Sequence, residues 1–123
     1  MENRGYHDRY TWAQSLFGMN DYRGAIKELE SLLAELAVDE DAGRAGVTDA
    51  RLLLARAYFH SASLGRAEST ARAVLAEDPT DAYAALLLAR TLERQARPEE
   101  AQMLLRRAAV LGAPGTSLAD LDR

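Results

Sequence analysis

Apolar residues recur along the chain at spacings of three and four, with polar and charged residues between them. Such spacing places the apolar side chains on one face of an α-helix. The pattern predicts six helices, each of about 14 residues and roughly 21 Å long. Asp81 follows Pro79 and Thr80 at one expected helix start, and Pro98 precedes two glutamates at another. Both arrangements are typical of helix N-termini.

This pattern of small and large apolar residues repeats along the chain. At an offset of 34 residues, Leu54, Ala55, Tyr58 and Ala67 correspond to Leu88, Ala89, Leu92 and Ala101. An upstream copy lies 42 residues before its counterpart and contains Ala13, Leu16, Ala25, Leu29 and Leu32. The excess falls in residues 40–47, which contain two glycines, so we predict an insertion there that forms a loop or extends a helix. A fixed period of this length indicates stacked helical repeats.

These residues resemble the tetratricopeptide repeat (TPR), a helix–turn–helix unit of 34 residues. Small residues occupy the family's repeat positions 8 and 20, and large apolar residues occupy positions 7 and 11, in three repeat units. The repeat units are 6–39, 48–81 and 82–115. Position 4 departs from the family pattern, because it holds Arg9, Arg51 and Ala85 instead of large apolar residues. The resemblance implies a single domain over 1–123, an all-α, right-handed α-solenoid.

The packing expected in such an array follows from the sizes of these side chains. Small residues at positions 8 and 20 let the two helices of a repeat unit approach closely, and stacking of units buries the face that one hairpin leaves open. We assign Trp12, at position 7 of the first repeat unit, to the core. Residues 116–123 are too few for a fourth repeat unit, and we expect them to form a short C-terminal capping stub.

Composition narrows the class of protein further. Ala and Leu are abundant while Val and Ile are scarce, which favours helix over a β-sandwich or barrel. The absence of cysteine excludes disulfides and thiolate metal sites. A formal net charge of −4 argues against non-specific nucleic-acid binding. We see no signal peptide and no apolar run long enough to span a bilayer, so we expect a cytoplasmic protein that binds neither nucleic acid nor membrane.

Candidate catalytic residues are sparse. The two histidines are His7 and His60, and the chain has no HExxH, GxSxG or phosphate-binding loop motif. Gly43 and Gly46 follow no expected strand, so we interpret them as part of a loop. The acidic run Asp39–Asp41 is more typical of a solvated helix end than of a cation site. We therefore expect no enzyme activity, no cofactor and no metal site.

The TPR resemblance implies a binding surface, because the family lines its concave face with side chains from the first helix of each repeat unit. The partner-binding groove residues expected here are Tyr10, Gln14, Phe17, Arg56, Phe59, Tyr83, Arg90 and Arg94. Aromatic side chains with arginines suit a peptide that carries apolar anchors and acidic groups. A guanidinium grips a carboxylate through two parallel hydrogen bonds, and aromatic rings offer a large contact area.

The residues alone leave other roles open. Phe17 and Phe59 also fit packing against a neighbouring helix, and an arginine such as Arg90 or Arg56 also fits a surface ion pair. We expect His60, beside a turn, to be a hydrogen-bonded structural residue. The family's carboxylate clamp for chaperone tails is missing, because the matching positions hold Tyr10, Gln14, Leu53, Tyr83 and Leu87.

The function expected from the sequence is a non-catalytic protein-interaction scaffold whose concave face binds a peptide or protein segment. Two alternatives stay open, a self-assembling homo-oligomeric subunit such as a homodimer, and a small ligand-binding protein or enzyme. Self-association would use the last helix, where four apolar residues cannot all face inward. These residues are Met103, Leu104, Val110 and Leu111.

Overall fold

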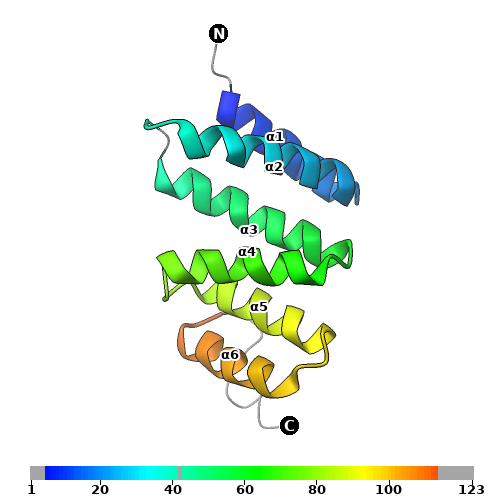
Figure 1. The fold of residues 1–123 in the computed structure, drawn as a ribbon, viewed down its shortest axis with the longest axis vertical. Helices are drawn as coiled ribbons and strands as arrows, with labels where there is room; N and C mark the ends of the chain where they lie inside the picture. The colour runs from blue at the N-terminus through cyan, green and yellow to red at the C-terminus, as the bar shows by residue number, and fades with distance from the viewer. Residues whose placement is uncertain (1–4, 42, 114–123) are drawn as a thin grey trace. The chain divides into compact units, whose positions relative to one another are not determined.

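The computed structural model describes residues 5–41 and 43–113, which form six α-helices and no strand. The helices are α1 (Gly5–Gly18), α2 (Tyr22–Val38), α3 (Arg44–His60), α4 (Leu64–Glu77), α5 (Ala82–Arg94) and α6 (Pro98–Val110) (Figure 1). The all-α fold predicted from the sequence is confirmed. The expected capping stub, residues 116–123, lies outside the described residues.

The chain divides into two compact parts, Met1–Ser63 and Leu64–Arg123, called the N-terminal half and the C-terminal half below. In the N-terminal half α2 packs against both α1 and α3, and α1 also touches α3. In the C-terminal half α5 packs against both α4 and α6. Each half is therefore built around its middle helix. The repeat unit 48–81 spans the division between the halves, and its assignment stays a prediction.

The middle helices carry the best-buried large side chains. Leu29 and Leu32 on α2, and Leu88 and Leu92 on α5, are at most 1% exposed. The alanines at repeat positions 8 and 20 are buried beside them. They are Ala13 and Ala25 in the α1–α2 pair, and Ala89 and Ala101 in the α5–α6 pair. Each pair thus combines large residues that exclude water with small residues that leave room for close helix packing.

Three of the turns between consecutive helices share one backbone geometry, which supports the repeat alignment. The residue at repeat position 15 has a positive φ in every copy: Asn20 (64°), Ala62 (64°) and Ala96 (60°). The next residue donates its backbone N–H to the carbonyl at position 11. These bonds join Asp21 to Leu16 (2.8 Å), Ser63 to Tyr58 (2.8 Å) and Arg97 to Leu92 (3.0 Å). Such a left-handed residue with a bond back to the last helical turn is a common way to end a helix.

Replacing Ala96 by glycine is expected to raise the free energy of unfolding by about 0.5–1 kcal/mol, because alanine is strained at positive φ and glycine is not. The change is measured by denaturant unfolding followed by circular dichroism. Ala73→Gly is the matched control, since Ala73 is exposed within α4 and glycine there should destabilise by a similar amount. Destabilisation by both variants would contradict the assigned turn geometry.

The insertion, residues 40–47, partly extends a helix, which is one of the two alternatives that the sequence left open. Helix α3 begins at Arg44, with Gly43 as an extended N-cap residue, and the Val47 N–H bonds the Gly43 carbonyl at 3.4 Å. The interpretation of Gly43 to Gly46 as loop was therefore wrong for its helical part. A single glycine costs a helix only about 1 kcal/mol, and burial of Ala50 and Leu53 further along α3 outweighs that cost.

The assignment of Trp12 to the core was wrong. Its side chain is 52% exposed, whereas the following Ala13 is fully buried. Among the described elements, α1 packs only against α2 and α3. The buried face of α1 follows Ala13 and Leu16, and Trp12 lies off that face. Leu54 and Leu88, at the same repeat position, are buried as expected.

Candidate functional site

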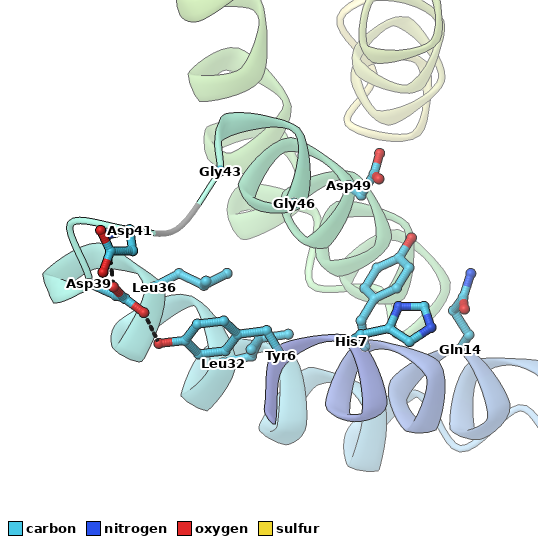
Figure 2. A pocket seen from close by; sticks show the side chains of 11 residues that line it. Tyr6, His7, Gln14, Leu32, Leu36, Asp39, Asp41, Gly43, Gly46 and Asp49 are labelled. Atoms are coloured by element: carbon cyan, nitrogen blue, oxygen red, sulfur yellow. Dashed lines mark hydrogen bonds between the residues drawn. The ribbon is translucent and has the colours of Figure 1, made fainter. Parts of the chain in front are cut away.

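A cleft of about 570 Å³ opens in the N-terminal half and is lined by residues of α1, α2 and the start of α3 (Figure 2). Helix α1 contributes Tyr6, His7, Tyr10 and Gln14, α2 contributes Leu32 and Leu36, and α3 contributes Gly46 and Asp49. The connection between α2 and α3 adds Asp39, Asp41 and Gly43. Figure 2 shows His7 and Gln14 projecting from α1 toward the opening, with Asp49 on α3. The volume is typical of a site for a small molecule or a short peptide segment.

One wall of the cleft is held together by hydrogen bonds around Asp39. The Tyr6 hydroxyl donates to one carboxylate oxygen of Asp39 at 2.6 Å, and the Asp41 backbone N–H donates to the other at 2.8 Å. The Tyr6 bond, followed by the Asp41 bond, holds the pKa of the Asp39 carboxyl below its ordinary value. The same bond, with burial, raises the pKa of the Tyr6 hydroxyl. Asp39 is therefore an ionised and oriented carboxylate at neutral pH.

Tyr10 and Asp49 define the opposite side of the cleft. Tyr10 is half-buried, and burial together with the nearby charge of Asp49 raises the pKa of its hydroxyl. The positive charge of Arg56 opposes this shift. Gly43 and Gly46 border the same space, and a methyl group built on either would meet no atom within 4 Å. The cleft thus stays open beside the first turn of α3.

A cluster of rings lies at the other end of α1, where His60 contacts the rings of Phe17, Tyr22 and Phe59. The Phe17 ring meets Tyr22 edge-on at 5.2 Å and His60 at 5.4 Å between ring centroids, and Tyr22 stacks on His60 at 5.1 Å. Phe59 meets the His60 ring at 5.5 Å. The Arg56 guanidinium carbon lies 4.6 Å from the centre of the Phe17 ring, a cation–π arrangement. This cluster ties the ends of α1 and α3 to the start of α2.

The expected groove residues of the C-terminal half all lie on α5. Tyr83 is 38% exposed, and Arg90 and Arg94 are exposed as well. Arg90 hydrogen-bonds both oxygens of Glu93, at 3.0 and 3.2 Å. The surface ion pair that the sequence left open for Arg90 is therefore present.

The cleft contains some residues that the sequence indicated and others that it did not. The spacing of first-helix residues pointed to Tyr10 and Gln14, and both line the cleft. Tyr6 and the carboxylates of Asp39 and Asp41 were missed, since the acidic run was interpreted as solvated surface. No periodic signal marks these residues, because the connection that carries them lies in the insertion between repeat units. Tyr22 and His60 were also not expected to share a ring cluster with Phe17.

Replacing Tyr6 by phenylalanine is expected to raise the pKa of Asp39 toward its ordinary value, because the Tyr6 hydrogen bond is the largest cause of the depression. A depressed carboxyl pKa contributes stability that is present above the unfolded-state pKa and is lost as pH falls through the folded-state pKa. In the Tyr6→Phe variant, the free energy of unfolding should therefore fall less steeply as the pH is lowered. Carboxyl chemical shifts followed by NMR across acidic pH measure the change, and an unshifted Asp39 titration would contradict the assignment.

Other kinds of site receive no support from the described part of the chain. Within residues 5–41 and 43–113, no group of three or more His, Asp or Glu side chains is placed to hold a metal ion. No helix among these residues is long and apolar enough to cross a membrane. The cleft and the neighbouring ring cluster are therefore the features on which a functional proposal is built.

Comparison with known proteins identifies the class of fold. No protein-family model matches the chain. No curated protein sequence is significantly similar to it. Among solved structures, the chain is similar to the TPR-containing C-terminal domain of a Plasmodium falciparum protein assigned as FK506-binding. The match has a TM-score of 0.79 and 20% sequence identity, and it covers 96% of this chain and 83% of that one.

The chain therefore has a TPR-like, all-helical repeat fold, as the sequence resemblance implied. The backbone turns at Asn20, Ala62 and Ala96 fit the same conclusion, since they recur at one position of the repeat alignment. At 20% identity the likeness shows the fold alone. What the chain binds has to be argued from its own cleft.

Proposed function

We propose that this chain is a non-catalytic protein-interaction module that binds a peptide segment of a partner in the cleft of its N-terminal half. The observation that carries the proposal is the cleft itself, in which Tyr6, His7, Tyr10 and Gln14 of α1 face carboxylates from α3 and from the α2–α3 connection. Tyrosine rings supply a large contact area at low entropic cost, and an amide side chain pairs with peptide backbone groups.

The neighbouring ring cluster supports the same role in two ways. The edge-on and stacked contacts of Phe17, Tyr22 and His60 fix the end of α1 against α2 and α3. A rigid wall loses little entropy when a ligand binds, which favours affinity. Phe17 and Phe59 are half-buried, so part of each ring stays available as an apolar edge beside Arg56. A bound segment longer than the cleft can continue along this edge.

The proposal is tested by selecting a displayed random peptide library on the immobilised full chain. Wild-type protein should enrich a set of related peptides. The double variant Tyr10→Ala with Gln14→Ala should lose at least about tenfold in affinity for them, because two cleft contacts worth roughly 1 kcal/mol each disappear. Fluorescence anisotropy with the enriched peptides measures the loss, and circular dichroism checks that the helices remain.

The control for that experiment is Met103→Ala, since Met103 is 70% exposed on α6 and lies outside the cleft. This variant should bind the enriched peptides like the wild type. An unenriched library, or peptides whose affinity is unchanged in the Tyr10 and Gln14 double variant, would refute the proposed function.

A second candidate function, self-association, is favoured by the surface of α6. Met103 and Val110 are 70% and 78% exposed and lie seven residues apart, hence on one helix face. The other two expected residues, Leu104 and Leu111, are half-buried. Leu104 lines a shallow groove together with Leu75 and Leu88. Pairing of two copies through this face would cover the exposed apolar side chains.

Self-association predicts a dimer whose mass halves in the double variant Met103→Glu with Val110→Glu. The two introduced carboxylates would repel those of the second copy across the dimer contact. Burying them there would also remove their solvating water, so the monomer is favoured. Sedimentation velocity at high micromolar concentration measures the mass. A monomeric wild-type chain at that concentration would remove this candidate and would leave the peptide-binding proposal untouched.

A further inference from the structure

The cleft is lined by negatively charged side chains as well as by aromatic rings. Among the described residues that line it, Asp39, Asp41 and Asp49 are carboxylates, and none is lysine or arginine. Asp39 is held ionised and oriented by the Tyr6 hydroxyl and the Asp41 N–H. The lining therefore presents negative charge from two sides, the α2–α3 connection and α3.

Arg9 on α1 and Arg56 on α3 are two basic side chains whose guanidinium groups make contacts outside the lining of the cleft. Arg9 on α1 turns to α2, where it hydrogen-bonds Glu28 at 2.9 Å, Glu35 at 2.7 Å and Ser31 at 2.9 Å. Arg56 on α3 lies over the Phe17 ring. Neither guanidinium lines the cleft, so its carboxylates keep their net attraction for an incoming cation.

The uncharged part of the lining fits one kind of cation better than others. The rings of Tyr6, Tyr10 and His7 provide faces on which a planar guanidinium can stack. Leu36 provides an apolar contact for a methylene stem, whereas Leu32 is almost fully buried. A bare metal ion would need its ligands gathered around one point, and no such group exists among the described residues. The carboxylates instead border a space large enough for a whole side chain.

We propose that the cleft binds an arginine side chain of the partner segment, with the guanidinium between Asp49 and the Tyr10 ring and the stem beside Leu36. This proposal rests on the proposed peptide-binding function and adds the chemistry of the ligand. It reverses the expectation from the sequence, in which arginines of the protein gripped acidic groups of the partner. Arg56 is placed over Phe17 and Arg90 beside Glu93, while the acids line the cleft.

The test uses the full chain and a defined probe, Nα-acetyl-arginine amide. Titration into ¹⁵N-labelled protein should produce saturable amide shifts at cleft residues such as Gly46 and Asp49, with a dissociation constant of about 1 mM for a ligand of this size. Nα-acetyl-citrulline amide has nearly the same shape without the charge, and it should give no saturable shift. Equal shifts with citrulline, or saturable shifts only outside the cleft, would overturn the arginine proposal.

The variant Asp49→Asn should weaken arginine binding about fivefold or more, because a charge-assisted hydrogen bond is lost. Glu40→Gln is the matched control. It removes the same charge from an exposed residue between Asp39 and Asp41 that does not line the cleft, and it should change the dissociation constant by less than about twofold. An equal effect of the two variants would show general attraction by the acidic surface and would contradict the specific site.

Failure of the arginine proposal can be told apart from failure of the proposed peptide-binding function. If the library selection yields peptides that depend on Tyr10 and Gln14 but lack a basic residue, the arginine proposal fails and the peptide-binding function stands. If selection yields no peptide while the arginine probe binds the cleft, the peptide-binding function fails and the cleft is a site for a cationic small molecule.

Discussion

Replacing Leu29 by alanine is expected to lower the free energy of unfolding by about 2–5 kcal/mol, the range found for large-to-small changes in protein cores. Leu29 is fully buried on α2, the helix that packs against both α1 and α3. Removing its side chain leaves a cavity in the middle of the N-terminal half. Urea unfolding followed by circular dichroism measures the change in midpoint.

The control lies in the same helix. Val38 is 83% exposed at the end of α2, so Val38→Ala should change the free energy of unfolding by less than about 0.5 kcal/mol. A small effect of Leu29→Ala, comparable to that of Val38→Ala, would mean that α2 is not the centre of a packed core.

Replacing Ala13 by leucine is expected to destabilise the chain by about 1–3 kcal/mol for the opposite reason, because a well-packed site has no room for extra carbons. Ala13 is fully buried on α1, at the repeat position where the TPR resemblance requires a small residue. The larger side chain forces α1 away from its neighbours. Since Tyr10 and Gln14 lie on the same helix, binding of the selected peptides should weaken as well.

Ala37→Leu provides the comparison for this variant, since Ala37 is exposed on α2. Adding the same atoms there should change the free energy of unfolding by less than about 0.5 kcal/mol and should leave peptide affinity unchanged. If Ala13→Leu is tolerated equally well, then close approach of the helices does not depend on the small residue at position 8.

The fold was largely predictable because its determinants are local and repeated. Small residues such as Ala13 and Ala89 recur at the same repeat position, and the turn residues Asn20 and Ala96 follow them at one fixed distance. The error at Trp12 has a physical reason. Repeat position 7 is buried at Leu54 and Leu88, but the packed face of the first helix follows Ala13 and Leu16 instead.

The candidate site was predictable only on the side formed by α1. Helical spacing placed Tyr10 and Gln14 on one face, whereas Asp39 and Asp41 reach the cleft from a connection that has no period. The roles of the arginines were not predictable either, since they depend on tertiary neighbours. Arg9 is taken up by glutamates of α2, and only the folded chain shows that the cleft is left acidic.

The most direct test of the account is to map the binding of a library-selected peptide on the ¹⁵N-labelled chain by NMR. We expect the largest amide shifts at Tyr10, Gln14, Gly46 and Asp49, which are four of the residues of α1 and α3 that line the cleft. Shifts confined to α6, or to the exposed Trp12 on α1 and Met19 in the turn after it, would contradict the assignment of the cleft as the binding site.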